Sequence, residues 1–168
     1  MTLDKKSTSS PGSSKKAIFG WVLFDFANSA YTTLVVTFIY GTYFVKAIAE
    51  DEIIGTALWS RAVTITAITV AFLSPVLGAV ADQGNLRKQF LAGSTFICVA
   101  ATAILNFILP GQVFSALLWF VISNIAFELT MVFYNAFLPD IAPMDKIGQI
   151  SGIGWGTGYL GGLMAMVI

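Results

Sequence analysis

The sequence predicts an all-α polytopic membrane protein, and two observations support this. Of its 168 residues, 57% are hydrophobic and only 11% are charged, whereas soluble domains typically have about 25% charged residues. The apolar residues also gather in five long runs. Each run is long enough to cross a hydrocarbon core of about 30 Å as a helix that rises about 1.5 Å per residue.

The five predicted helices cover residues 18–45, 62–81, 89–109, 113–138 and 149–168, within a transmembrane domain of residues 17–168. The first run contains one charged residue, Asp25, the fourth contains one, Glu128, and the others contain none. The fifth run is still apolar at Ile168, where no polar flank follows. Because membrane helices usually end in an interfacial anchor, we expect a chain that is incomplete at its C-terminus.

Residues 1–16 form a tail that is rich in Ser and Lys, with a Pro-Gly pair, and has nothing to bury, which predicts disorder. A secretory signal is disfavoured because the apolar stretch that follows is too long and has no evident cleavage site. Seven basic residues fall on the side of this tail and two on the other side. By the positive-inside rule, the N-terminus and the loops 82–88 and 139–148 are predicted to be cytoplasmic.

The composition also excludes several classes of function. The net charge is zero, so no binding of nucleic acid is indicated. The chain has no histidine, and its one cysteine, Cys98, lies in an apolar run; we therefore predict no metal site and no cofactor. The absence of a phosphate-binding loop disfavours an ATP-driven pump, and the absence of a catalytic cluster disfavours an enzyme.

The turn between the second and third runs carries charges that oppose the helix dipoles. Asp82 stands at a helix C-terminus, and Arg87 and Lys88 stand at a helix N-terminus. Topology alone could explain the basic pair, but it does not explain Asp82. Since Asp82 and Arg87 are only five positions apart, these charges can pair with each other or with a neighbouring helix end. We interpret the cluster as a latch that helix movement can break.

Residues 78–88, with Gly78, Asp82, Gly84 and the Arg87-Lys88 pair, resemble the cytoplasmic loop 2–3 signature of the major facilitator superfamily. The sequence departs from that signature at Val80 and Gln83, its second glycine comes one position early, and its basic pair comes one position late. The segments GWVLFDFANSAY (20–31), FYNAFLPDIA (133–142) and GIGWGTGYLGG (152–162) resemble the vacuole-effluxer-like branch, which is related to the amino-acid exporter of fungal vacuoles. The resemblance implies an N-terminal fragment with the first five of twelve helices.

Polar residues inside the first and fourth runs are candidates for a solute or ion pathway. They are Asp25, Asn28, Ser29 and Thr32 on one predicted stripe and Asn124, Glu128 and Asn135 on the other. Charges inside a membrane usually face a water-filled path or a partner. The resemblance implies that these two helices line a central cavity, where carboxylates at similar depth could bind a proton, a cation or a substrate amine. Hydrogen bonding between helices, without transport, is the alternative.

The fifth run contains Gly154, Gly158 and Gly162, and this GxxxG spacing predicts close helix packing. The function predicted from the resemblance is secondary active transport of small solutes by alternating access, possibly amino-acid efflux with a coupled proton. The partners would be the lipid bilayer, the solute and the missing C-terminal helices. The membrane would be the plasma membrane in a bacterium or the vacuolar membrane in a fungus. The alternatives are a non-transporting scaffold, a channel or an inactive truncated fragment.

Overall fold

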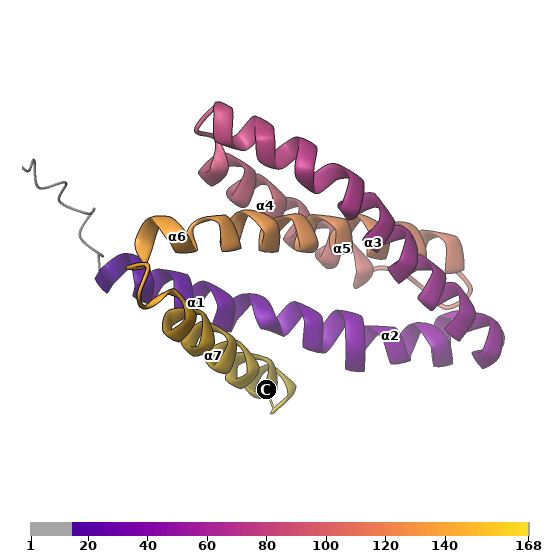
Figure 1. Ribbon diagram of the computed structural model, residues 1–168. Helices are drawn as coiled ribbons and strands as arrows, with labels where there is room; N and C mark the ends of the chain where they lie inside the picture. The colour runs from indigo at the N-terminus through magenta and orange to yellow at the C-terminus, as the bar shows by residue number, and fades with distance from the viewer. Residues whose placement is uncertain (1–14, 168) are drawn as a thin grey trace, which may run out of the picture.

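The computed structural model describes residues 15–167, and their regular secondary structure is entirely helical, which confirms the all-α prediction (Figure 1). The elements in order are α1 (Lys15–Tyr31), the π-helix η1 (Thr32–Phe38), α2 (Tyr40–Tyr43), the π-helix η2 (Phe44–Ile48), α3 (Glu52–Gln83), α4 (Arg87–Leu105), α5 (Val113–Ala136), α6 (Leu138–Ile141) and α7 (Ile147–Val167). The predicted tail lies outside the described residues except for Lys15 and Lys16, which begin α1. Ile168 also lies outside them.

The first predicted helix is a continuous helical stretch of 34 residues, Lys15–Ile48, that includes two π-helical segments. At the end of η1 the amide of Ile39 donates to the carbonyl of Leu34, five residues earlier, at 3.0 Å. A π-helical turn holds more residues than an α-helical turn. The α-helical spacing used to predict the faces of this helix therefore stops applying after Tyr31.

The second helix, α3, begins at Glu52, ten residues before its predicted start at 62. Asp51 caps it, because its carboxylate accepts hydrogen bonds from the amides of Ile53 and Ile54, both at 2.9 Å. This cap satisfies donors that a helix N-terminus otherwise leaves free. The other boundaries differ from the prediction by at most four residues at an end.

Four helices among residues 15–167 are long and apolar enough to cross a membrane. They are Lys15–Ile48, Glu52–Gln83, Arg87–Leu105 and Val113–Ile141. The fifth predicted span is a helix of 21 residues, α7, which is long enough but is not one of these four. The chain is therefore a multi-pass membrane protein, and α7 is the span whose membrane crossing is least evident from composition.

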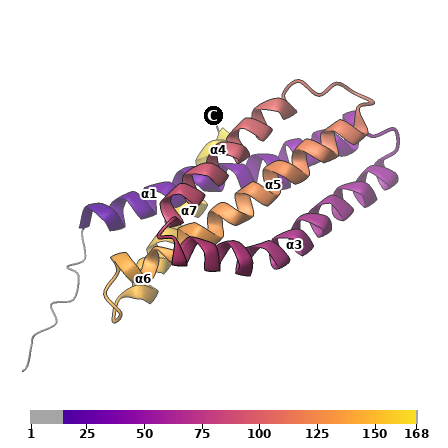
Figure 2. The same cartoon turned by 90° about the horizontal axis from the view of Figure 1, so that it is seen from above.

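Helix α5 lies at the centre of the bundle, where it packs against both α3 and α4, while α1 packs along α7 (Figure 2). The core is made of close aromatic contacts and short polar bridges. Phe120 of α5 is fully buried, and its ring centroid lies 3.9 Å from that of Trp59 of α3. On the other side of α5, the hydroxyl of Thr130 lies 2.8 Å from that of Ser94 in α4. These contacts hold three helices as a unit against which α1 and α7 are placed.

Candidate functional site

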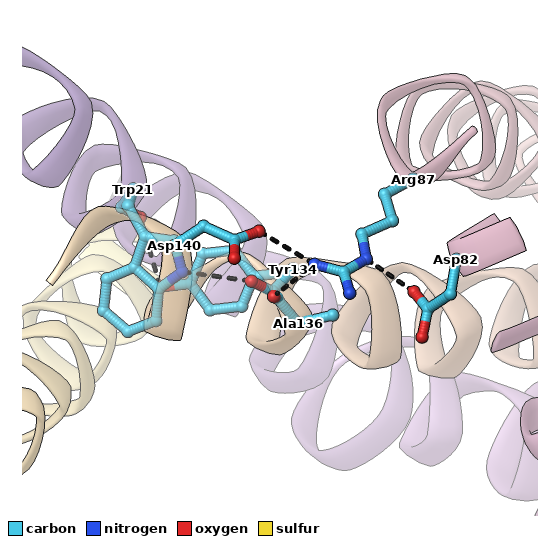
Figure 3. A network of polar contacts seen from close by, with 6 residues as sticks. All are labelled: Trp21, Asp82, Arg87, Tyr134, Ala136 and Asp140. Atoms are coloured by element: carbon cyan, nitrogen blue, oxygen red, sulfur yellow. Dashed lines mark hydrogen bonds and ion pairs between the residues drawn. The ribbon is translucent and has the colours of Figure 1, made fainter. Parts of the chain in front are cut away.

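Arg87, the first residue of α4, joins the ends of several helices (Figure 3). Its Nε donates to the Oδ1 of Asp82, in the last turn of α3, at 2.6 Å. Its Nη1 donates to the Oδ2 of Asp140 in α6 at 2.8 Å and to the carbonyl of Ala136, the last residue of α5, at 3.3 Å. One guanidinium thus connects α3, α4, α5 and α6 at one end of the bundle.

This geometry explains the unfavourable electrostatics of the 82–88 turn. A cation opposes the dipole at the N-terminus of α4, but the Arg87 side chain extends to the C-terminus of α5, where a cation is favourable. Its charge also offsets that of Asp82. The side chains of Asp82 and Asp140 are 56% and 60% exposed, and that of Arg87 is 30% exposed. Exposed ion pairs are weak and screened by salt, so this junction can be broken by modest forces.

The remaining residues of the predicted loop site have different surroundings. Gly84 is the C-cap residue that follows α3, and the left-handed position of the turn is Asn85, with φ of 51°. Asn tolerates this conformation, and it stands where the signature has its second glycine, which explains the displaced glycine of this sequence. Gly78 has open space where a side chain would be. Lys88 is exposed and forms no ion pair within residues 15–167.

The polar stripe predicted on the first helical stretch, at Asp25, Asn28, Ser29 and Thr32, meets more than one neighbour. Asp25 and Ser29 face α7, since a Cβ placed on Gly158 would lie 3.1 Å from Asp25 Oδ2 and 2.7 Å from Ser29 Oγ. Asn28 faces α5, where its Nδ2 donates to the Sδ of Met131 at 3.1 Å. Thr32 is exposed. The set therefore divides between two helix contacts and an open face, because one helical stripe can meet two neighbours.

The polar residues of α5 also differ in burial. Asn124 is buried, whereas Glu128 and Asn135 are exposed on one face of the helix. Asp25 is buried with only 7% of its surface exposed. No hydrogen bond or ion pair joins Asp25 to Glu128 within residues 15–167. The structure therefore gives these two carboxylates different environments and does not bring them into contact.

A reciprocal contact between Trp21 and Tyr134 fastens α1 to α5 beside Asp25, and the sequence analysis did not find it. The indole Nε1 of Trp21 donates to the carbonyl of Tyr134 at 3.1 Å, and the phenol of Tyr134 donates to the carbonyl of Trp21 at 3.1 Å. Their rings stack with centroids 4.4 Å apart. Both residues fall in the quoted family segments, but 113 residues separate them, and only the fold reveals the pairing.

The glycines of α7 lie against α1. Gly154, Gly158 and Gly162 are all buried, and a Cβ on each would meet a side chain of α1 or, for Gly162, of η1. Gly161 lies even closer, because its Cβ would overlap the backbone carbonyl of Phe26. Gly156 has open space around it. One face of α7 therefore packs directly on the backbone of α1, as small residues allow in membrane helices.

A hollow of about 300 Å³ lies between the first helical stretch and α4. Its lining is mostly apolar, with polar atoms from Asn28, Thr95 and Thr102. Among residues 15–167, no three His, Cys, Asp or Glu side chains are grouped so that they could hold a metal ion.

Comparison with known proteins extends this description. Residues 52–168 match the family model described as "Vacuole effluxer Atg22 like". An "Uncharacterized MFS-type transporter YxiO" of Bacillus subtilis (strain 168) is 35% identical over 151 residues, which cover 88% of this chain and 35% of that protein. An "Uncharacterized protein" of Aquifex aeolicus (strain VF5) is 28% identical over 149 residues, covering 88% of this chain and 36% of that protein. The chain thus spans about a third of the length of these relatives. No solved structure matches.

Proposed function

Because the chain belongs to the vacuole effluxer Atg22-like family and is related to MFS-type transporters, we propose that it supplies helices of a secondary active transporter. The solute is small and crosses by alternating access, in which two halves of the full-length protein rock about a central site. The family description, an effluxer, supports export as the direction. Amino acids are the solute class that the resemblance to the fungal vacuolar exporter implies.

The observation that carries this proposal is the Arg87 junction. A transporter that changes sides must hold one conformation closed and then release it, which requires contacts between helix ends that are specific but breakable. Arg87 makes such contacts with Asp82 and Asp140, all at one end of the bundle. Their exposure keeps them weak enough to open during a transport cycle. By the distribution of basic residues, this end is cytoplasmic, so the junction would close the cytoplasmic entrance.

The polar residues of the first and fourth helices form the proposed pathway. Asn28 and Thr32 on the first helical stretch and Asn124, Glu128 and Asn135 on α5 provide hydrogen-bonding groups at membrane depth. Polar groups are costly in a membrane unless they face water, a solute or a partner. Glu128 and Asn135 are exposed on this chain, which leaves them free to face a central cavity completed by further helices.

Two single-residue variants of the full-length protein, assayed in proteoliposomes, test this function. Arg87→Gln and Lys88→Gln remove the same charge from the same loop, so they change the topology signal equally. Only Arg87→Gln breaks the junction. We expect its transport of a labelled amino acid to fall about tenfold, within the range typical of coupling between conformational states. Lys88→Gln should stay close to the parent. Equal losses in both variants would reduce the loop to a topology signal.

A further inference from the structure

The indole of Trp21, on α1, lies where three helices of the bundle meet. It is 8% exposed, and its ring stacks on that of Tyr134 of α5, with the two ring planes 10° apart. On α7, Gly154 leaves room for the same indole, because a Cβ there would overlap its Cζ3 and lie 2.9 Å from its Cη2. One side chain of α1 therefore contacts both α5 and α7.

Trp21 and Arg87 hold the same end of α5. The last carbonyl groups of a helix have no partner within the helix. In the last turn of α5, the carbonyl of Tyr134 accepts from Trp21 Nε1 at 3.1 Å, and the carbonyl of Ala136 accepts from Arg87 Nη1 at 3.3 Å (Figure 3). The first donor comes from α1 and the second from α4. Both fix the position of a single turn.

The second acceptor of Arg87 Nη1 also rests on the surroundings of Trp21. This acceptor, Asp140, belongs to α6, a single turn whose first residue, Leu138, is buried. Leu138 and Trp21 belong to one buried apolar cluster, to which α7 contributes Ile150. In the described part of the chain, no residue of α3 belongs to this cluster. A shift of the indole therefore displaces the end of α5 together with α6, and Arg87 joins both of these to the end of α3.

We propose that Trp21 is a positioning residue for the Arg87 junction and links the closure of the junction to the packing of α7 on α1. When α7 lies against α1, Gly154 confines the indole against Tyr134, and both acceptors on α5 and α6 stay within reach of Arg87. When α7 moves away, the indole is released, the end of α5 shifts and the junction opens. This inference rests on the proposed function and names the residue that relays helix movement to the cytoplasmic closure.

Amide hydrogen exchange measures this link in a segment outside the Trp21 cluster. In the turn after α3, the amides of Gly84 and Leu86 donate to carbonyls of α3 at 3.0 and 2.8 Å. Their exchange reports how often the turn opens, whether or not solute is transported. Peptides that cover this turn would be followed by mass spectrometry on the full-length protein in nanodiscs. The pH is chosen so that the turn of Arg87→Gln still exchanges more slowly than an unstructured peptide.

The first comparison is between Trp21→Phe and Trp119→Phe. Trp21→Phe keeps an aromatic ring and removes the N–H that holds the end of α5. Trp119→Phe makes the same change within α5, where the indole forms no hydrogen bond with residues 15–167. We expect the turn to exchange about fivefold faster in Trp21→Phe, at the lower end of typical coupling between sites, and at the parent rate in Trp119→Phe. Parent exchange in Trp21→Phe would overturn the inference.

A double-mutant cycle then tests whether the effect passes through Arg87. In an Arg87→Gln background, Trp21→Phe should add nothing to the exchange of the turn, because the link is already cut. The same fivefold increase in both backgrounds would mean that the effect bypasses Arg87, and the inference would fail. From the side of α7, Gly154→Ala should speed exchange of the turn, whereas Gly156→Ala, whose Cβ meets nothing within 4 Å, should not.

Transport assays on the same proteins separate this inference from the proposed function. If the exchange results are as expected but the parent protein accumulates no solute, the proposed function fails and the link between Trp21 and Arg87 stands. If the parent accumulates solute and Trp21→Phe leaves the exchange of the turn unchanged, the inference fails and the function stands.

Discussion

Replacing single glycines of α7 with alanine tests how closely this helix packs on α1. Gly156 and Gly161 both lie inside α7, so each change to alanine gains about the same 1 kcal/mol of helix propensity. A Cβ at position 156 meets nothing within 4 Å. A Cβ at position 161 would overlap the carbonyl oxygen of Phe26, a backbone atom that cannot rotate away as a side chain could. Only Gly161→Ala should therefore force the two helices apart.

The size of the effect follows from the packing. Overpacking of this kind costs about 1–3 kcal/mol of stability. Because both variants gain the same helix propensity, that cost is the expected difference in the free energy of unfolding between Gly161→Ala and Gly156→Ala. Gly158→Ala should fall between them. Its Cβ would lie 2.7 Å from the flexible Ser29 Oγ, where ordinary contact begins at 3.4 Å, so the hydroxyl must yield by 3.4 − 2.7 = 0.7 Å.

Equilibrium unfolding in mixed micelles, followed by tryptophan fluorescence, would measure these differences on the full-length protein. Trp21 packs against Gly154 of α7 and should report separation of the helices directly. We expect the free energy of unfolding to be lowest for Gly161→Ala, intermediate for Gly158→Ala and highest for Gly156→Ala. Equal stability of Gly161→Ala and Gly156→Ala would refute the close contact between α7 and α1.

Three further predictions concern other parts of the chain. Thr130→Val should lower the free energy of unfolding by about 0.5–1.5 kcal/mol, because it removes the buried hydrogen bond with Ser94. The hydroxyl of Thr95 bonds only within its own helix, so Thr95→Val should lower that free energy by less in the same unfolding experiment. Asp140→Asn should reduce transport at low salt, and the difference from the parent should shrink at high salt, since screening weakens the parent's exposed pair; a salt-independent difference would contradict this. Single cysteines at Gln83 and Glu50, in a Cys98→Ala background, should be labelled from the cytoplasmic and the opposite side respectively, and labelling of both from one side would contradict the topology.

Much of the fold could be predicted from the sequence, because membrane spans are set by local apolar runs. The all-α class and most helix boundaries follow from that signal alone. The early start of α3 does not, since residues 52–61 are too polar to resemble a span, and the helix forms there because Asp51 caps it. The π-helical segments after Tyr31 leave no clear mark on the apolar pattern either.

The candidate site was only partly accessible from sequence for a related reason. The pairing of Asp82 with Arg87 is local, because the two residues are five positions apart, and the way their charges oppose the helix dipoles indicated it. Asp140 lies 53 residues from Arg87, and its role depends on how α5 and α6 return to the same end of the bundle. Periodicity placed the polar residues of α1 on one side of a helix but could not show which neighbour each one meets. That assignment requires the packed structure.

Concentrative transport by the full-length protein tests the central claim most directly. Proteoliposomes would be loaded with buffer at one pH and diluted into buffer at another, which imposes a pH gradient. A labelled amino acid would then be added, and its accumulation would be followed with and without a protonophore. We expect saturable accumulation against the solute gradient that the protonophore abolishes. Flux that rises linearly with concentration, never exceeds equilibrium and ignores the pH gradient would contradict a proton-coupled secondary transporter.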